Sequence, residues 1–430
     1  MNAEIPHISA RDVPLRQLWV GGRRAARVGT SGAQLGLVAT ANGYLATAPV
    51  DERWAEDEVE MRWPSQIQKW IEPRCVVSSV QGANISVAPE CWSRLIQRNG
   101  GSLPPSPLRL ENVRMAPLAG EFYSSRDTVY FRPWSEEPYR SPEDAWVGLV
   151  NHSFTGLNFM HASWRVPADD GGFVPTQSLV MDHEEPAGAV RFSHSTWLAV
   201  QRCSFSHVGA AYALSIGGAS QHIVVSESSF LDLSGGAIMI GNVNEVRALT
   251  RDADKFDVGY LLRDNVMRGV AVEFRGAAAI FAGYVARTNI LHNTIIDTGY
   301  TGISLGWGWG KHVNGPQTFA ADNVVAYNRL IGVMSALNDG GCIYTLGPQP
   351  RSKVEGNYCS ADRASVVGCF YHDNGSRYFS TQFNVAESSP APCVYLQGCC
   401  GAPAYDVAVS HLWCRSTGDR DLDGHHKPKQ

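Results

Sequence analysis

The stretch from Leu291 to Ser376 decides the fold. It contains LHNTIIDTGYTGISLGWGWGKH from Leu291, ADNVVAYNRLIGVMSALNDGGCIYTLGPQP from Ala321, and GNYCSADRASVVGCFYHDNGS from Gly356. Each segment has an Asn near its start, followed by a polar link, a Gly, a short apolar run and a loop. Self-similarity at a spacing of roughly 25 to 36 residues, with one supersecondary unit per repeat, indicates a solenoid.

The apolar runs, at 302–305, 341–345 and 368–372, are too short for helices and fit the buried strands of a parallel stack. Asn293, Asn328 and Asn357 fall where each coil must bend. Asn tolerates the left-handed backbone conformation and can hydrogen-bond to its own main chain, so stacked Asn residues can form a ladder. We therefore predict an all-β fold, a right-handed parallel β-helix in which each coil buries its apolar face on its neighbours.

The composition of the chain agrees with many turns, since its 430 residues include 42 Gly and 23 Pro. A net charge of −5 does not indicate the excess of basic residues that is typical of nucleic-acid-binding proteins. No apolar run approaches the roughly 20 residues of a membrane-spanning helix. Paired CxxC zinc spacing and nucleotide-binding or zinc-protease motifs are missing from the sequence. We expect a monomer with no nucleic-acid or membrane partner, no metal and no cofactor.

Most of the ten Cys residues lie between Cys342 and Cys414. They could form disulfides that tie the end of the solenoid in an oxidising compartment. They could instead be small apolar residues that stack inside the coils, and the sequence slightly favours this second interpretation for Cys342 and Cys369.

Residues 1–145 have a different pattern of apolar and polar residues. LRQLWVGGRRAARV, CVVSSVQGANISVAP and EFYSSRDTVYFRPW alternate apolar and polar residues around turn signals. This pattern predicts an antiparallel, β-sandwich-like module with hairpins, and one helix over 63–71. The coil-like pattern begins after the Pro-containing stretch at 138–142 and persists to about residue 412. We predict the module at 1–145, the β-helix at 146–415 and a disordered polar tail at 416–430.

A resemblance follows from these motifs. The succession LRQLWVGGRRAARV, LENVRMAPLAGEFY, TVYFRP, NFMHASW, CSFSHVG, GISLGWGWG, LNDGGCIYTLGPQP and FYHDNGS resembles the right-handed parallel β-helix proteins of the glycoside hydrolase family 141 type. It covers the chain from about Leu15 to Arg415. The resemblance implies activity on plant-type polysaccharides, as in α-L-fucosidases and xylanases. It also implies that residues 1–145 are the sandwich-like module that such proteins carry.

The resemblance further implies an extracellular protein. MNAEIPHISARDVPLR lacks the basic start and apolar core of a secretory signal. Relatives usually carry a signal and several coils ahead of the LRQLWV-like strand, so we expect either that another segment caps the solenoid or that the sequence is a truncated gene product. Relatives also commonly have an acidic residue where this chain has Asn374.

The candidate catalytic groups are Asp339 and Asp373, which lie in consecutive coils within LNDGGCIY and FYHDNGS. Glycoside hydrolysis usually needs two carboxyl groups, one protonated and one ionised. An Asp before a turn can also be merely structural. Aligning 341–345 with 368–372 places Asp373 beside Leu346 and leaves Asp339 several residues away. The pair therefore requires a turn or bulge near Gly340 and Gly341.

The substrate contacts are predicted on a loop and on two aligned strands. The GWGWG loop should be exposed, because glycines contribute no side chain to a core and are costly to order. Exposed indole rings can stack on the apolar faces of sugars. A packing cap for the coil edge is the alternative. Alternate side chains of the aligned strands leave the interior, so some should line a groove. The predicted substrate-binding residues are Trp307, Trp309, His312, Asn338, Tyr344 and His372.

The sequence thus predicts a glycoside hydrolase that cleaves plant-type or algal polysaccharide with two Asp carboxyls. Two alternatives remain open, because one scaffold can serve several functions. One is a non-catalytic carbohydrate-binding or structural β-helix, a decayed paralogue, which Asn374 favours. The other is a polysaccharide lyase or epimerase, which needs a base and often Ca²⁺ or a basic residue.

Overall fold

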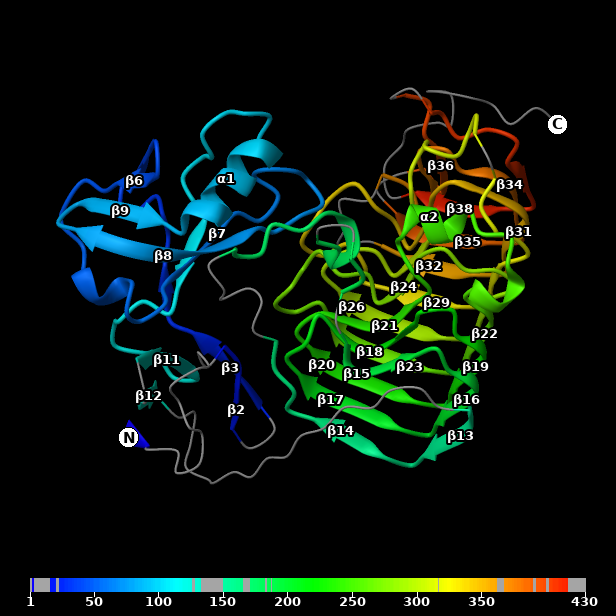
Figure 1. The fold of residues 1–430 in the computed structure, drawn as a ribbon, viewed down its shortest axis with the longest axis horizontal. Coiled ribbons are helices and arrows are strands. Elements are labelled where there is room, and N and C mark those ends of the chain that lie inside the picture. The colour runs from blue at the N-terminus through cyan, green and yellow to red at the C-terminus, as the bar shows by residue number, and fades with distance from the viewer. Residues whose placement is uncertain are drawn as a thin grey trace. The chain divides into compact units, whose positions relative to one another are not determined.

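The computed structural model describes residues 2–3, 16–20, 23–125, 128–132, 150–164, 171–181, 184–186, 188–315, 317–361, 367–389, 392–399 and 402–416. The chain divides into two compact units (Figure 1). The N-terminal unit comprises 1–142 and 163–176, and the β-helix unit comprises 143–162 and 177–430. The predicted boundary near residue 145 lies outside the described residues, as does the predicted disordered tail at 416–430 except for Ser416, which ends a strand.

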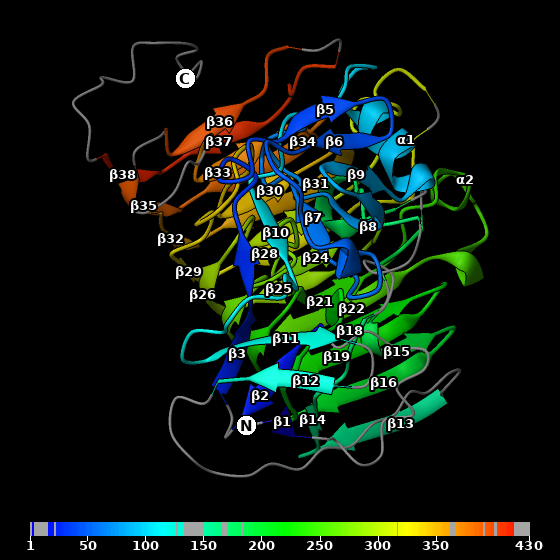
Figure 2. The same ribbon diagram turned by 90° about the vertical axis from the view of Figure 1, so that its left-hand side faces the viewer.

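The described part of the N-terminal unit forms two mainly antiparallel sheets, and Figure 2 shows β11 and β12 side by side in one of them. The five-stranded sheet has the order β1 (Asn2–Ala3), β12 (Thr128–Phe131), β11 (Glu121–Ser125), β3 (Arg23–Arg27), β2 (Leu18–Val20). The seven-stranded sheet has the order β4 (Gly29–Thr30), β10 (Arg109–Glu111), β7 (Glu60–Arg62), β8 (Arg74–Gln81), β9 (Asn84–Val87), β6 (Gly43–Leu45), β5 (Val38–Thr40). The predicted β-sheet module is therefore present.

The helix predicted over 63–71 is wrong. Ser65 takes a left-handed conformation (φ 55°), and its backbone N–H donates to the Ile71 carbonyl at 3.0 Å, which closes a loop instead. The helix of this unit is α1 (Pro89–Arg98), directly after β9. Its sequence signals were a Pro in the first turn and the apolar side of Trp92 and Leu95, both buried.

A network of buried charges lies within the seven-stranded sheet. Arg74 donates to Glu60 at 2.7 Å and to Glu72 at 2.8 Å, and Arg62 contacts Glu72 and Glu111. These side chains are at most 9% exposed. Burial alone would raise the pKa of Glu111, but the neighbouring guanidinium groups outweigh burial and lower that pKa to about 2.

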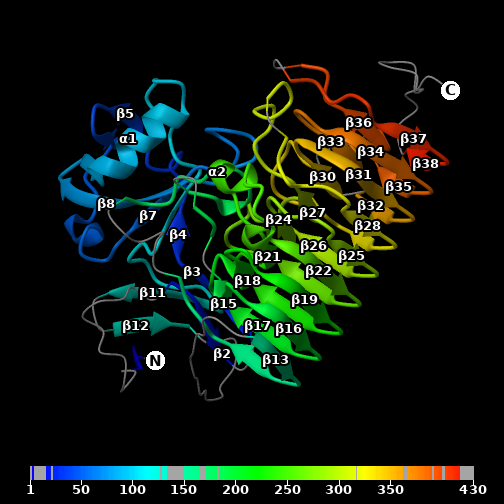
Figure 3. The same ribbon diagram turned by 45° about the vertical axis from the view of Figure 1, so that its right-hand side comes forward.

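The β-helix unit consists, in its described residues, of three parallel sheets, and each full coil contributes one strand to each (Figure 3). Sheet 1 contains β13 (Val150–Thr155), β16 (Thr196–Gln201), β19 (Gln221–Ser226), β22 (Val258–Arg263), β25 (Asn289–Leu291), β28 (Val324–Ala326), β31 (Pro348–Glu355), β34 (Arg377–Gln382) and β37 (Ala408–Ser410). Sheet 2 contains β14 (Asn158–Met160), β17 (Ser204–Val208), β20 (Ser229–Leu233), β23 (Val266–Val270), β26 (Thr294–Thr298), β29 (Arg329–Ile331), β32 (Tyr358–Ser360), β35 (Val385–Ser389) and β38 (Trp413–Ser416). Sheet 3 contains β15 (Gly188–Ser193), β18 (Tyr212–Gly217), β21 (Gly236–Ile240), β24 (Ile280–Ala282), β27 (Ile303–Leu305), β30 (Ile343–Thr345), β33 (Phe370–His372) and β36 (Val394–Leu396). The predicted right-handed parallel β-helix is confirmed.

Helices are few and short in the described residues. Besides α1 they are α2 (Glu245–Ala248) and the 3₁₀ turns Glu52–Trp54, Gln177–Leu179 and Ala253–Lys255. No helix in the described part of the chain combines the length and the apolar character needed to cross a membrane.

Rows of aligned apolar side chains from successive coils fill the interior of the β-helix. In sheet 2 the register aligns Phe159, Phe205 and Phe230, and their rings stack at centroid distances of 4.7 and 4.8 Å. The same row continues with Met267 and Ile295, both fully buried. Each coil therefore buries its apolar face only on its neighbours, as a solenoid must.

The predicted Asn ladder is confirmed and is longer than expected. Each side-chain amide donates to the amide oxygen of the next Asn at 3.0 Å, through Asn265, Asn293, Asn328, Asn357 and Asn384. The expectation that these Asn residues adopt the left-handed conformation is wrong. The residue before each takes it, as His292 (φ 55°) and Tyr327 (φ 57°) do, and this turn points the Asn side chain into the coil.

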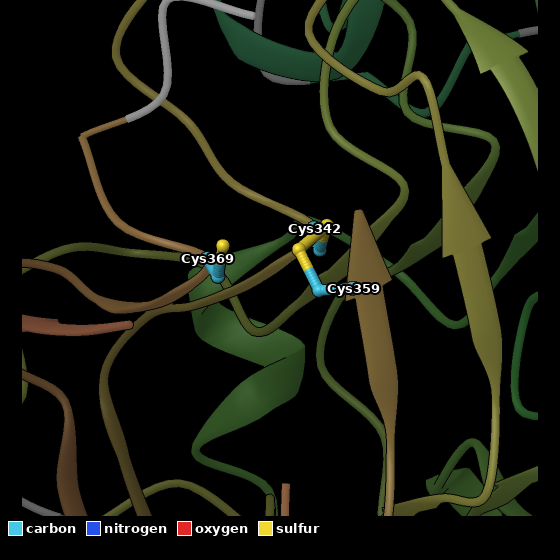
Figure 4. A group of neighbouring side chains, drawn as sticks. All are labelled: Cys342, Cys359 and Cys369. Carbon is cyan, nitrogen blue, oxygen red and sulfur yellow. A yellow bond between two sulfur atoms is a disulfide. The ribbon is translucent and has the colours of Figure 1, made fainter. Parts of the chain in front are cut away.

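Disulfides occur in both units and correct the slight preference for apolar filling at Cys342. The pairs between described residues are Cys75–Cys91, Cys342–Cys359 and Cys393–Cys414, and Cys399 is disulfide-bonded as well. Cys369 keeps a buried thiol, as the packing interpretation requires. Figure 4 shows this thiol beside the Cys342–Cys359 disulfide, with all three sulfurs within 4.8 Å of one another. Because two of the sulfurs are joined, the cluster in this state offers a metal one thiolate.

Candidate active site

Sheet 3 aligns the two strands that carry the candidate site. In adjacent coils, Tyr344 of β30 pairs with Tyr371 of β33, and Thr345 pairs with His372. Asp373 follows β33 directly, and its backbone N–H donates to the Thr345 carbonyl at 3.1 Å. The side chains of Tyr344, Tyr371 and Asp373, from two successive coils, therefore lie next to one another.

Two packed tyrosines link the Asp339 and Asp373 carboxyl groups. The Tyr371 hydroxyl donates to Asp339 Oδ1 at 3.2 Å, and the Tyr371 ring packs edge-on against Tyr344 at 5.1 Å. The Tyr344 hydroxyl donates to Asp373 Oδ2. Two tyrosine hydroxyls thus hold the two carboxyl groups on the same side of the coils.

A turn before β30 makes this meeting possible. Asp339 adopts the left-handed conformation (φ 64°), so the chain does not run straight into the strand. Gly341 is needed after it, because a Cβ there would lie 2.2 Å from the Gly368 carbonyl oxygen. A straight strand would have kept Asp339 out of reach.

The surroundings of Asp373 favour its protonated form. The residue is 7% exposed, and burial raises its pKa. The hydrogen bond from Tyr344, the Asn374 backbone N–H and the nearby Tyr371 hydroxyl favour the ionised carboxyl group and oppose this rise, but burial prevails. Burial, followed by the charges of Asp373 and Asp339, raises the pKa of Tyr371, so this hydroxyl keeps its proton at neutral pH.

Four further residues of the site were missed by the sequence analysis. Gln397, just after β36, donates to the Tyr371 hydroxyl at 3.2 Å. The Tyr300 hydroxyl donates to the Asp339 carbonyl at 2.8 Å and accepts from Gln177 at 2.9 Å. Tyr371 itself stands beside Asp373 in FYHDNGS, so its alignment with Tyr344 was the available signal. Gln397 and Gln177 lie too far along the chain to be linked from sequence.

The GWGWG loop differs from the exposed loop that was expected. Trp307 is 3% exposed and packs edge-on against Phe281 at 5.7 Å and against Trp309 at 4.8 Å. Gly308 gives this packing its space, because a Cβ there would lie 2.1 Å from the Tyr284 hydroxyl. Trp307 therefore fills the coil edge, whereas Trp309 is partly exposed and packs against the tyrosines of the site.

His312 is also buried, at 7% exposure, and lines a small hollow together with Tyr284 and Trp307. Its Nε2 and the Tyr284 hydroxyl have no hydrogen-bond partner among the described residues. Burial lowers the pKa of His312, so the ring is neutral at pH 7.

His372 does not line a groove, contrary to expectation. It is 1% exposed, and its ring nitrogens lie 2.8 Å from the hydroxyls of Thr345 and Thr381 inside the coil. Burial lowers its pKa to about 3, which keeps the ring neutral. Tyr344 is buried too but reaches Asp373, and Asn338 is partly exposed next to Asp339.

A solved glycoside hydrolase shares this fold. The two chains are 21% identical and superpose with a TM-score of 0.72 over 96% of this chain and 79% of that one. More distant matches are the Streptococcus pneumoniae surface protein and adhesin PfbA (TM-score 0.31, 12% identity, 53% of this chain and 67% of that one) and the Pseudomonas phage phi297 tailspike gp61 (0.30, 12%, 89% and 63%). No protein-family model and no curated protein matches the sequence. Identity this low shows the fold alone, so the function has to be argued from the site.

Proposed function

We propose that this protein is a glycoside hydrolase that cleaves a polysaccharide with Asp339 and Asp373 as its two carboxyl groups. The observation that carries the proposal is the packed pair Tyr371 and Tyr344, whose hydroxyls donate to Asp339 and Asp373 respectively. Glycosidic hydrolysis requires two carboxyl groups close enough to act on one bond. The fold shared with a solved glycoside hydrolase supports the proposal.

The two carboxyl groups receive different roles in this proposal. Because burial raises the pKa of Asp373, its carboxyl group keeps a proton more readily and donates it to the leaving oxygen. Asp339 is less buried and acts as the ionised partner, either as nucleophile or as base for water. Trp309, packed against Tyr344 and Tyr371, offers an aromatic face on which a sugar ring can stack.

The wider setting follows from the same proposal. Plant-type or algal polysaccharides, in a fucosidase-like or xylanase-like reaction, are the substrate class to test first. The disulfides support a location outside the cell, since they persist in oxidising compartments. Residues 1–145 would then serve as an accessory module beside the β-helix.

The test measures reducing-sugar release from xylans, pectins and algal fucans by the wild type, Asp373→Asn and Asp339→Asn. Each substitution should lower the rate by about 100-fold or more, because a positioned acid or base contributes roughly 10²–10⁴-fold. Asp297→Asn is the matched control. Asp297 is exposed and adopts the left-handed conformation (φ 56°), which Asn also accepts. The Asp297→Asn variant should therefore keep the wild-type activity.

Two results would contradict the proposal. One is wild-type activity that survives Asp373→Asn in folded protein, with circular dichroism used to verify the fold. The other is a wild type that releases no sugar from any substrate. Unsaturated products that absorb ultraviolet light would instead indicate a lyase.

A further inference from the structure

The corner between sheets 1 and 2 carries an exposed row of residues in successive coils. The register pairs Ala326 with Glu355, Glu355 with Gln382, and Gln382 with Ser410. The residue after each of these four turns the corner in the left-handed conformation. The row is Tyr327 (φ 57°), Gly356 (φ 67°), Phe383 (φ 57°) and His411 (φ 51°).

Two residues of this row are large aromatics in a conformation that such side chains rarely adopt. Tyr327 is 57% exposed and Phe383 is 56% exposed, so burial in a core does not explain them. Gly or Asn would turn the same corner with less strain. The left-handed corner is a structural feature of every coil of the Asn ladder, so what calls for a function is the choice of two exposed aromatic rings at this corner.

Neighbouring rings hold both aromatics in place. His292 contacts Tyr327 edge-on at 5.6 Å, and His411 stacks on Phe383 at 4.7 Å. Gly356 leaves room between the two, because a Cβ there would come within 2.6 Å of the Tyr327 ring. The rings are thus preorganised, which lowers the entropy cost of binding a ligand.

We propose that Tyr327 and Phe383 form a surface site for an extended, neutral β-1,4-linked polysaccharide chain that runs along the β-helix axis. The two residues are two coils apart, which is about 9.5 Å at the spacing of neighbouring strands. In an extended β-1,4-linked chain, alternate sugars present the same face over a comparable distance. Apolar faces of such sugars stack on aromatic rings.

Neutrality of the ligand follows from the charges beside the row. Glu355 accepts a hydrogen bond from Gln382 at 3.0 Å, and Glu387 lies 3.7 Å from Arg415. Glu355 keeps its negative charge because Gln382 is neutral, and Arg415 lies beside Glu387, so these groups give no excess of positive charge for an anionic polymer. Trp413, 50% exposed and two residues after His411, extends the aromatic surface.

The site is separate from the candidate carboxyl pair, which sheet 3 carries, but it rests on the proposed carbohydrate function. It would hold the polymer while the active site cleaves it. The experiment measures retention of the protein on insoluble cellulose, mannan and chitin, with starch granules as an α-linked control. The variants are Tyr327→Asn, Phe383→Asn and the double substitution, since Asn accepts the left-handed corner.

The double variant should lower the affinity for β-1,4-linked polymers by about tenfold or more, which corresponds to about 1.4 kcal/mol. Its melting temperature should not fall, because the substitution relieves backbone strain. Hydrolysis of short soluble oligosaccharides should be unchanged. Trp197→Asn is the matched control, since Trp197 is exposed (58%), left-handed (φ 57°) and stacked on His222, but Gly259 takes the equivalent position two coils away, so no second ring completes a pair.

Equal retention of the wild type and the double variant overturns the proposal, and so does a wild type that none of the three polymers retains. If the double variant has a lower melting temperature and unchanged retention, the two rings serve packing, and the surface-site proposal is overturned as well. A protein that shows ring-dependent retention without any hydrolysis leaves the surface site standing while the hydrolase proposal falls. Hydrolysis without ring-dependent retention leaves the hydrolase proposal standing while the surface-site proposal falls.

Discussion

At the scale of single residues, Tyr371 is the centre of the candidate site. Its hydroxyl donates to Asp339 Oδ1 and accepts from Gln397, each at 3.2 Å, and its ring packs against Tyr344, the donor to Asp373. The two adjacent tyrosines hold the carboxyl groups near each other, and the different burial of these groups then lets one hold a proton while the other is ionised.

Tyr371→Phe tests this role. We expect kcat to fall about 10- to 100-fold, because a hydrogen bond to a charged group contributes about 1.5–3 kcal/mol. The Tyr371 hydroxyl lowers the pKa of Asp373, so its removal raises that pKa further. An acid catalyst is active below its pKa, and the basic limb of the pH–rate profile should therefore move to higher pH.

Tyr395→Phe is the control for this substitution. The Tyr395 ring packs against Tyr371 at 5.3 Å, so the variant perturbs the same cluster and leaves the Tyr371 hydroxyl in place. An unchanged pH profile in Tyr371→Phe, or the same shift in both variants, would contradict the role assigned to Tyr371.

At the scale of the elements, the Asn ladder ties successive coils together. Asn328 donates to the Ile290 carbonyl at 2.8 Å and to Asn357 at 3.0 Å, and it accepts from Asn293. All of these groups are buried, so each needs its partner.

Asn328→Ala should lower the free energy of unfolding by about 3 kcal/mol, because it leaves several buried polar groups without partners at about 1–3 kcal/mol each. Urea denaturation followed by circular dichroism measures the loss. Arg329→Ala, at the neighbouring exposed position, should change stability by about 0.5 kcal/mol at most. Equal effects of the two substitutions would show that the ladder does not hold the coils.

The three cysteine sulfurs around Cys342 make a second prediction about these coils. Removing Cys359 leaves the Cys342 and Cys369 sulfurs within 4.8 Å of each other on adjacent strands. Under oxidising conditions, Cys359→Ser should form a Cys342–Cys369 disulfide, detected by mass spectrometry of non-reduced peptides. The double variant Cys359→Ser, Cys369→Ser should leave Cys342 as a thiol, and a Cys342 thiol in the single variant would refute the prediction.

At the scale of the whole molecule, the two units rely on different interactions. The β-helix unit repeats one packing arrangement from coil to coil, whereas the N-terminal unit places a charge network inside a sheet. Removing one partner from such a network is costly, because the other charge remains buried.

The N-terminal unit should therefore lose stability in acid. The pKa of Glu111 falls from 4.5 to about 2 on folding, so its stabilising effect is present above pH 4.5 and is lost as the pH falls toward 2. The urea midpoint of this unit, followed by near-ultraviolet circular dichroism, should decrease over that window. In Glu111→Gln the decrease should be smaller, and an identical slope in both proteins would contradict the prediction.

The sequence by itself determined the β-helix. Its coils repeat Asn, Gly and a short apolar run, and the same residue types recur wherever the same local geometry recurs. The Asn ladder and the parallel strands were therefore predictable, because every coil meets an almost identical neighbour. The helix α1 was missed because alternation around it pointed to strands.

Only the tertiary structure decided which side chains meet at the site. Asp339 and Asp373 could be named from their motifs, but whether they meet depends on the left-handed turn at Asp339. The burial of Trp307 and His372 and the approach of Gln397 depend on contacts between coils that no local pattern records. Local sequence sets backbone propensity and periodicity, whereas the depth and direction of a side chain are set by the neighbours that pack around it.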